Sequence, residues 1–135
     1  MDLTNLDAEI AKDETGAVIP INQKNGDAYR AADGTPATVT VVGSESKRYK
    51  DARNLITKRA INLRRQKMDP ADLERNRIDL AVAAIIDWSG WEIGGKVAEC
   101  TPQNIRQLLR ADHILEQVEA GIVGHADFFS TPSSS

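Results

Sequence analysis

Apolar residues recur every three or four positions along most of the chain from residue 44 onward, which is the spacing of one face of an α-helix. In the first such segment, 44–68, we expect Ser44 to be the N-cap residue. The apolar face of this helix contains Tyr49, Ala52, Ile56, Ala60 and Leu63. The pattern therefore predicts a long helix with one buried face and one polar face.

Two proline-containing signals start further helices. Asp69-Pro70 is typical of a cap residue followed by the first helical position, and we expect this second helix to continue to about Asp87. Thr101-Pro102 predicts a third helix by the same reasoning, and a last helix begins at about Asp112. The pattern thus predicts about four helices within 44–129.

Segment 16–43 has a strand-like pattern instead. β-Branched residues alternate with other residues in 35–43, and a short apolar run occupies 17–21. Asn25-Gly26, between the two, is typical of a tight hairpin turn. We therefore expect a small antiparallel β-hairpin or three-strand meander here. The strand that contains Pro20 should lie at its edge, because proline cannot donate a hydrogen bond to a neighbouring strand.

The longest apolar run, 80–95, contains both tryptophans of a chain that is poor in aromatic residues. We expect the hydrophobic core to be built on this run, because large side chains bury the most apolar area. Gly94-Gly95 then predicts the tip of a very short hairpin over 91–97.

Together these elements predict an α+β protein that is mostly helical. A length of 135 residues fits one domain. We assign it to 16–129, with the hairpin in 16–43 and the helices in 44–129. Residues 1–15 have helical spacing but no evident attachment, and are expected to be a flexible segment. Phe128-Phe129 would anchor the end of the domain, and 130–135 is expected to be a disordered tail.

The single cysteine and the hydropathy of the chain indicate in which cellular compartment the protein is expected. Cys100 is the only cysteine, so no intramolecular disulfide can form, and its neighbour Glu99 disfavours a thiolate. The first residues are acidic, where a secretory signal peptide would be basic and then apolar. No apolar run reaches the roughly 18 residues that span a bilayer. We therefore expect a cytoplasmic protein that makes no membrane contact.

Charge is distributed unevenly along the chain. Segment 44–68 contains nine basic and two acidic residues, although the net charge of the whole chain is −3. Such a basic helix would bind an acidic partner, or be neutralised by the acidic remainder of the molecule. The basic residues that lie away from the apolar face are candidates for partner binding: Lys50, Arg53, Lys58, Arg64 and Arg65.

Nucleic acid is the alternative partner for this basic helix. Each lysine or arginine that contacts a phosphate would add salt-dependent affinity. However, no aromatic residues alternate with the bases to stack on nucleobases, the whole chain is acidic, and no known DNA-binding motif is present. The composition therefore favours an acidic protein surface over nucleic acid.

The sequence contains no motif for catalysis or for a cofactor. His113 and His125 have no cysteine or further histidine at the spacing of zinc ligands, and the glycines around Gly90 form no phosphate-binding loop. Paired acids on helices, such as Glu116 and Glu119, are typical of solvated helix surfaces. We therefore expect a non-enzymatic protein. Trp91 lies in a turn, so its ring is a further candidate for partner contact.

The order of several weak motifs resembles one family. An Ala/Ile-rich helix ends in Trp88-Ser89-Gly90, the turn Gly94-Gly95 follows, and the next helix runs from Thr101-Pro102-Gln103-Asn104 to Leu108-Leu109. A closing helix stops at Phe128-Phe129, and upstream a strand passes into the basic helix through Gly and Ser. Over about 16–129 this order is similar to the small tail assembly chaperones of phages with long, flexible tails. Trp91 directly after Trp-Ser-Gly departs from the family pattern.

The resemblance implies a non-enzymatic role in the cytoplasm of a bacterial host during phage assembly. Proteins of this family bind the long, helical tape measure protein, keep it soluble and help tail tube protein to polymerise around it. Self-association is also expected. No binding residue of the family can be matched to a position here. The alternatives are a structural component of the virion, such as a tail or connector subunit, and a nucleic-acid-binding accessory protein that uses 44–68.

Overall fold

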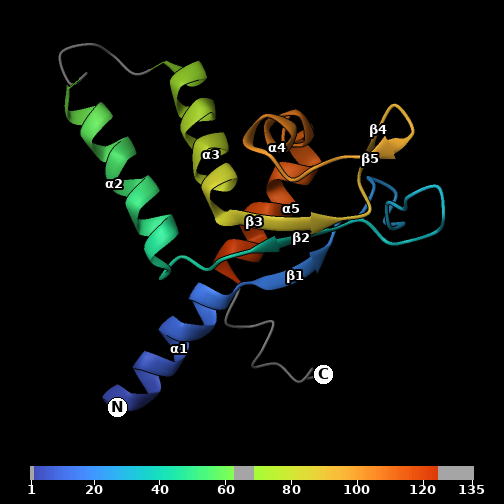
Figure 1. Ribbon diagram of the computed structural model, residues 1–135. Helices are drawn as coiled ribbons and strands as arrows, with labels where there is room; N and C mark the ends of the chain where they lie inside the picture. Colours follow the sequence, from blue (N-terminus) through green and yellow to red (C-terminus); the bar gives the residue numbers. More distant parts are fainter. Residues whose placement is uncertain (1, 63–68, 125–135) are drawn as a thin grey trace.

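The computed structural model describes residues 2–62 and 69–124, which form an α+β structure made mostly of helices. Figure 1 shows a small sheet with helices packed beside it, while the helices over Leu3–Thr15, Lys47–Asn62 and Pro70–Ala84 extend away from it. The helices are α1 (Leu3–Thr15), α2 (Lys47–Asn62), α3 (Pro70–Ala84), α4 (Pro102–Leu108) and α5 (Asp112–Val123). The strands are β1 (Ala17–Pro20), β2 (Thr38–Val41), β3 (Ile85–Ser89), β4 (Glu92–Ile93) and β5 (Lys96–Val97).

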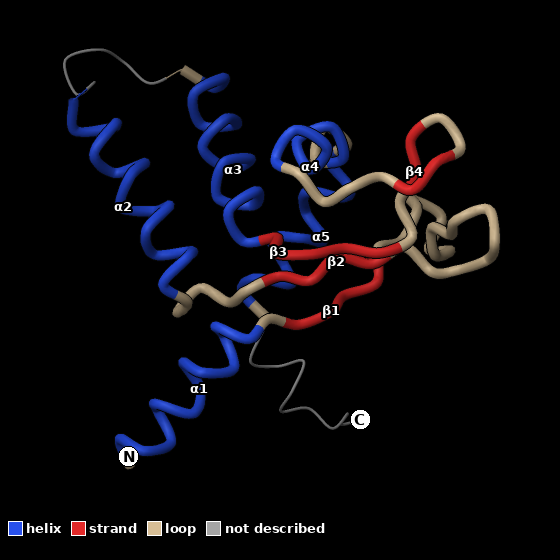
Figure 2. Tube along the Cα trace, viewed as in Figure 1, coloured by secondary structure: helices blue, strands red, loops and turns tan. Residues whose placement is uncertain are grey.

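The main sheet has three antiparallel strands in the order β1-β2-β3 (Figure 2). β1 and β2 pair as the predicted N-terminal hairpin, with Ala17 opposite Val41. Pro20 lies on the edge strand β1, as the sequence predicted. The third strand comes from the middle of the chain, so the sheet is not a meander within 16–43.

The second helix ends earlier than predicted. We expected it to reach about Asp87, but α3 ends at Ala84 and Ile85 begins β3 without an intervening loop. Val41 pairs with Ile85, and Val39 pairs with Trp88. The apolar run 80–95 is thus divided between a helix and a strand. Burial on several sides explains its apolar character equally well in either conformation.

The turn after β3 depends on Gly90. Its φ is +84°, a region that residues with a Cβ rarely adopt, and a Cβ there would lie 2.7 Å from the carbonyl oxygen of Pro36. The backbone of the long β1–β2 connection therefore approaches this turn closely. Beyond it, β4 and β5 form the predicted short hairpin with Gly94-Gly95 at its tip.

The hydrophobic core lies between one face of the sheet and helices α3, α4 and α5. From the sheet, Ile19, Val39 and Val41 are buried, whereas Val18 and Pro20 on the opposite face are exposed. α5 contributes the largest set of buried residues: Ile114, Leu115, Val118, Gly121 and Ile122. A Cβ on Gly121 would lie 2.6 Å from Ile19, so the glycine lets α5 approach β1 closely.

Residues 1–15, which we expected to be flexible, contain the helix α1. Asp2 caps it by accepting a hydrogen bond from the N–H of Thr4 at 2.9 Å. Its last turn contacts the rest of the described structure, where Asp13 is buried against Gly43. This helix brings the number among the described residues to five, against the four predicted for 44–129. The predicted anchor Phe128-Phe129 and tail 130–135 lie outside the described residues.

Candidate protein-binding surface

The basic segment forms α2, which begins three residues later than predicted. Ser46, rather than Ser44, acts as the cap: its hydroxyl oxygen accepts a hydrogen bond from the N–H of Tyr49 at 3.1 Å. Of the predicted apolar face, Tyr49, Ala52, Ile56 and Ala60 are half-buried, and Leu63 lies outside the described residues. No described residue of α2 is fully buried.

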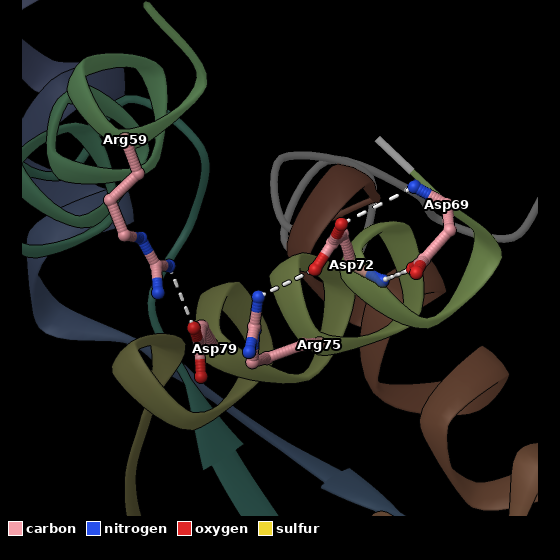
Figure 3. A network of polar contacts seen from close by, with 5 residues as sticks. All are labelled: Arg59, Asp69, Asp72, Arg75 and Asp79. Atoms are coloured by element: carbon pink, nitrogen blue, oxygen red, sulfur yellow. Dashed lines mark hydrogen bonds and ion pairs between the residues drawn. The ribbon is translucent and has the colours of Figure 1, made fainter. Parts of the chain in front are cut away.

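α3 is the main packing partner of α2, and the two helices extend together away from the sheet (Figure 1). Arg59 on α2 donates to the carboxylate of Asp79 on α3 at 2.8 Å (Figure 3). Arg48 donates to the backbone carbonyl of Ala83. A helix in the interior of a domain is covered on several sides, whereas α2 packs mainly on α3 and has no buried residue among those described. Its other sides are therefore available for contact with a second protein.

Asp79 connects three helices. Its second carboxylate oxygen lies 2.8 Å from Arg106 on α4, so one acid pairs with bases from α2 and from α4. Burial opposes ionisation of the Asp79 side chain, which is 18% exposed, but the hydrogen bonds from Arg59 and Arg106 outweigh this effect and lower its pKa. Asp79 therefore holds α2 at a defined position relative to the core.

The start of α3 is stabilised by hydrogen bonds between its own first residues. Asp69 and Asp72 form a capping box, in which each side chain accepts a hydrogen bond from the backbone N–H of the other residue (Figure 3). Arg75 donates to Asp72 at 2.7 Å, one turn further along. The predicted Asp-Pro start is confirmed, and both acids have structural roles.

The predicted binding residues differ in how far they are neutralised. Lys50 pairs with Glu45 at 2.9 Å, and its hydrogen bond lowers the pKa of the Glu45 carboxyl group. Arg53 and Lys58 are exposed and form no ion pair with any other described residue. Arg64 and Arg65 lie outside the described residues. Within the described part of α2, the charge that a partner would meet comes mainly from Arg53 and Lys58.

Two large apolar side chains accompany these bases. Leu55 is 63% exposed and Ile61 is 55% exposed, and both lie on α2 away from α3. Sequence reasoning missed them because they fall outside the apolar face that packs on α3. A helix spacing of three places Leu55 next to Lys58, and Lys58 next to Ile61. The outer face of α2 (Lys58, Leu55 and Ile61) is therefore both basic and apolar, and Arg53 is a further exposed base on another side of the helix.

Trp91 has a structural role in addition to any contact with a partner. Its indole N–H donates to the carbonyl oxygen of Thr38 at 3.0 Å, and its ring lies 5.7 Å from Tyr29 and 6.2 Å from Trp88. Trp88 in turn donates to the carbonyl of Ala98 at 2.8 Å. The half-buried ring joins the β3–β4 turn to the sheet.

A surface pocket of about 240 Å³ lies beside the two tryptophans. Its lining is mainly apolar and comes from the β4–β5 hairpin and from α4: Trp88, Trp91, Glu92, Ile93, Ala98, Asn104, Gln107 and Leu108. The β4–β5 hairpin, which contributes to this lining, lies at the opposite end of the sheet from α2 (Figure 1). The predicted binding residues Arg53 and Trp91 are therefore not brought into one site.

Of the remaining candidate groups, His125 lies outside the residues that the structure describes. His113 shares a 2.6 Å hydrogen bond with the hydroxyl of Tyr29. Cys100 is half-buried, and this burial, followed by the nearby charge of Asp87, raises the pKa of its thiol. Among residues 2–62 and 69–124, no three His, Cys, Asp or Glu side chains are grouped so that they could hold a metal ion. In the same ranges, no helix has the length and apolar character needed to cross a membrane.

Comparison of the chain with models of known protein families, with curated protein sequences and with solved structures found no match.

Proposed function

We propose that this protein is a tail assembly chaperone of a phage with a long, flexible tail, and that it binds the tape measure protein without catalysing a reaction. The observation that carries the proposal is the state of α2. It is a helix of 16 residues that contains no buried residue and carries Leu55 and Ile61 exposed on either side of Lys58. Such a surface fits an interaction protein better than an enzyme.

The outer face of α2 has the chemistry to bind another helix. A long helical protein that has not yet assembled exposes apolar stripes flanked by charged side chains. Leu55 and Ile61 would cover part of such a stripe, and Lys58 between them would pair with an acidic side chain at its edge. Binding of this kind withdraws apolar surface from water, so it would oppose aggregation of the client.

The charge balance of α2 supports a protein partner over nucleic acid. Residues 47–62 include six bases, but Lys47, Lys50 and Arg59 are each paired with an acid, and Arg48 bonds to a carbonyl. The two bases of 47–62 that form no ion pair with another described residue are Arg53 and Lys58. Two such bases would release few counterions from a phosphate backbone, and would therefore provide little affinity for nucleic acid. The apolar residues between them have no role in such a contact.

Co-expression tests the proposal. The chain should be produced in bacteria together with the tape measure protein of the same phage, and the soluble fraction of that protein measured. We expect the client to remain soluble and to co-purify with the chain. A client that aggregates equally with and without the chain would refute the chaperone role. Presence of the chain in purified virions would instead favour a structural tail or connector component.

A charge-reversal variant tests the surface. Arg53→Glu combined with Lys58→Glu should lower the amount of soluble client, because both side chains are exposed and unpaired among the described residues. Lys96→Glu on β5 is the matched control, since it reverses an exposed charge at the far end of the molecule. If the two variants protect the client equally, α2 is not the binding surface. DNA binding that declines steeply with salt would favour the nucleic-acid alternative.

A further inference from the structure

We infer that the protein forms a symmetric dimer in which α1 of each copy packs along the outer face of α2 of the other copy. The inference concerns the contact between two copies of this chain, and it does not depend on the identity of the client. It rests on two helices that each expose large apolar side chains in the described part of the chain and that carry exposed charges of opposite sign.

α1 is the first of these helices. It has 13 residues, and its apolar positions Leu3, Leu6 and Ile10 follow the spacing of one helix face. Leu3 is 72% exposed and Leu6 is 39% exposed, while Ile10 is half-buried. Asp13 and Glu14, near the end of α1, bond to the start of α2, whereas Leu3 and Leu6 at its beginning are exposed in the described structure of a single copy.

The charges of α1 and α2 are complementary. Residues 3–15 contain four acids, of which Asp13 and Glu14 bond to the start of α2 in the same copy while Asp7 and Glu9 are exposed. Residues 47–62 contain six bases, of which Arg53 and Lys58 are exposed and form no ion pair with another described residue. On a helical wheel, Asp7 and Glu9 lie on the two sides of the Leu3–Leu6–Ile10 stripe. The outer face of α2 offers two exposed apolar residues with Lys58 between them. Apolar contact can therefore form with an acid of α1 close to Lys58.

The arrangement of the two helices allows a reciprocal exchange. Figure 1 shows α1 and α2 leaving the sheet on the same side of the molecule, where the end of α1 meets the start of α2. A two-fold axis on that side would place each α1 against the α2 of the partner. One contact between helices of this length is small beside the roughly 1,600 Å² of a typical stable interface, and the exchange makes the contact twice.

The test is the molar mass in solution. We expect the full chain to sediment as a dimer at low salt, and to dissociate as salt increases, because exposed charges are screened. Leu3→Ser with Leu6→Ser should raise the dimer dissociation constant by about tenfold or more, since two apolar contacts are lost per helix. Val97→Ser, a change of another exposed apolar residue on β5, should leave it unchanged. Far-UV circular dichroism checks that all variants are folded.

Charge exchange identifies the two surfaces. The variant Asp7→Lys with Glu9→Lys and the variant Arg53→Glu with Lys58→Glu should each dissociate. A protein that carries all four changes should regain the dimer, because the attraction is restored with its signs reversed. A monomeric full chain at low salt would overturn the inference. So would a dimer that is indifferent to the α1 changes, or four changes that add their effects without any recovery.

Discussion

The carboxylate of Asp13, in the last turn of α1, accepts a hydrogen bond from the backbone N–H of Glu45 at 2.8 Å, just before α2 begins. Next to it, the carboxylate of Glu14 accepts from the N–H of Lys47. The first N–H groups of a helix have no partner within the helix, and they carry partial positive charge. Glu14 therefore satisfies the first N–H of α2 and Asp13 holds the turn just before it, and this sets the direction in which both helices leave the sheet.

Gly43 is part of the same junction, and it should be energetically coupled to Asp13. A Cβ at position 43 would lie 2.2 Å from the carboxyl carbon of Asp13, so Gly43→Ala should destabilise the fold by about 1–3 kcal/mol. Asp13→Ala should cost about 1–3 kcal/mol, because the N–H of Glu45 loses its acceptor. Urea unfolding of both variants measures these free energies.

The double variant distinguishes this explanation from two independent defects. With alanine at position 13 the carboxylate is gone, so the second methyl group meets less crowding. We expect Asp13→Ala with Gly43→Ala to cost less than the sum of the single changes by about 1 kcal/mol or more. Strict additivity would show that Gly43 is required for its backbone conformation and not for the close approach of Asp13.

Asp79 should make stability depend on pH in the acid range. Its folded pKa lies below the ordinary carboxyl value, so its contribution is fully present above the unfolded pKa of about 3.9 and is lost as the pH falls through the lower folded pKa. Asp79→Asn should therefore be less stable than wild type at pH 7, by about 1–2 kcal/mol. Thermal unfolding from pH 7 down to pH 2 measures the difference.

Asp51 provides the control for this experiment. It also pairs with a base, Lys47 at 2.6 Å, but both side chains are well exposed and solvent screens their attraction. Asp51→Asn should therefore leave stability almost unchanged at every pH. If the deficit of Asp79→Asn persists unchanged down to pH 2, ionisation of Asp79 is not its cause, and the loss would arise from packing between α2, α3 and α4.

The indole N–H of Trp91 should contribute to stability separately from its ring. Trp91→Phe retains an aromatic ring beside Tyr29 but leaves the carbonyl of Thr38 without this donor, so we expect a loss of about 1 kcal/mol. Chemical unfolding followed by circular dichroism measures it. Val97→Ala in the adjoining hairpin should have no effect, because Val97 is exposed. A Trp91→Phe variant as stable as wild type would mean that the ring alone holds this turn.

Local signals in the sequence were sufficient for the elements that depend on short-range chemistry. Asp69-Pro70 and Thr101-Pro102 start helices, and Gly94-Gly95 forms a turn, because caps, prolines and glycines act on their immediate neighbours. The strand nature of Ile85 could not be predicted in this way. It depends on pairing with Val41, more than 40 residues away, and apolar residues in a buried run fit a helix equally well.

The candidate surface could be predicted only in part, for a similar reason. The apolar face of α2 follows from spacing within one segment, and so does the position of its bases. Which bases are neutralised depends on tertiary partners: Arg59 meets Asp79 across two helices, while Lys58 meets no acid among the described residues. The hydrogen bond between Asp13 and the N–H of Glu45, just before α2, also joins residues far apart in sequence, so no local sequence motif predicts it.

The two proposals together lead to a competition between self-association and client binding. If α1 of the partner copy covers the outer face of α2, a client helix must displace it to reach Leu55 and Lys58. Leu3→Ser with Leu6→Ser should therefore keep more of the client protein soluble than wild type does at equal expression, because the outer face of α2 is no longer covered by α1 of the partner copy. Soluble client in co-expressing cells, normalised to the amount of this protein, is the measurement. A decrease would show that α1 itself contacts the client, and an unchanged amount would place the two contacts on separate surfaces.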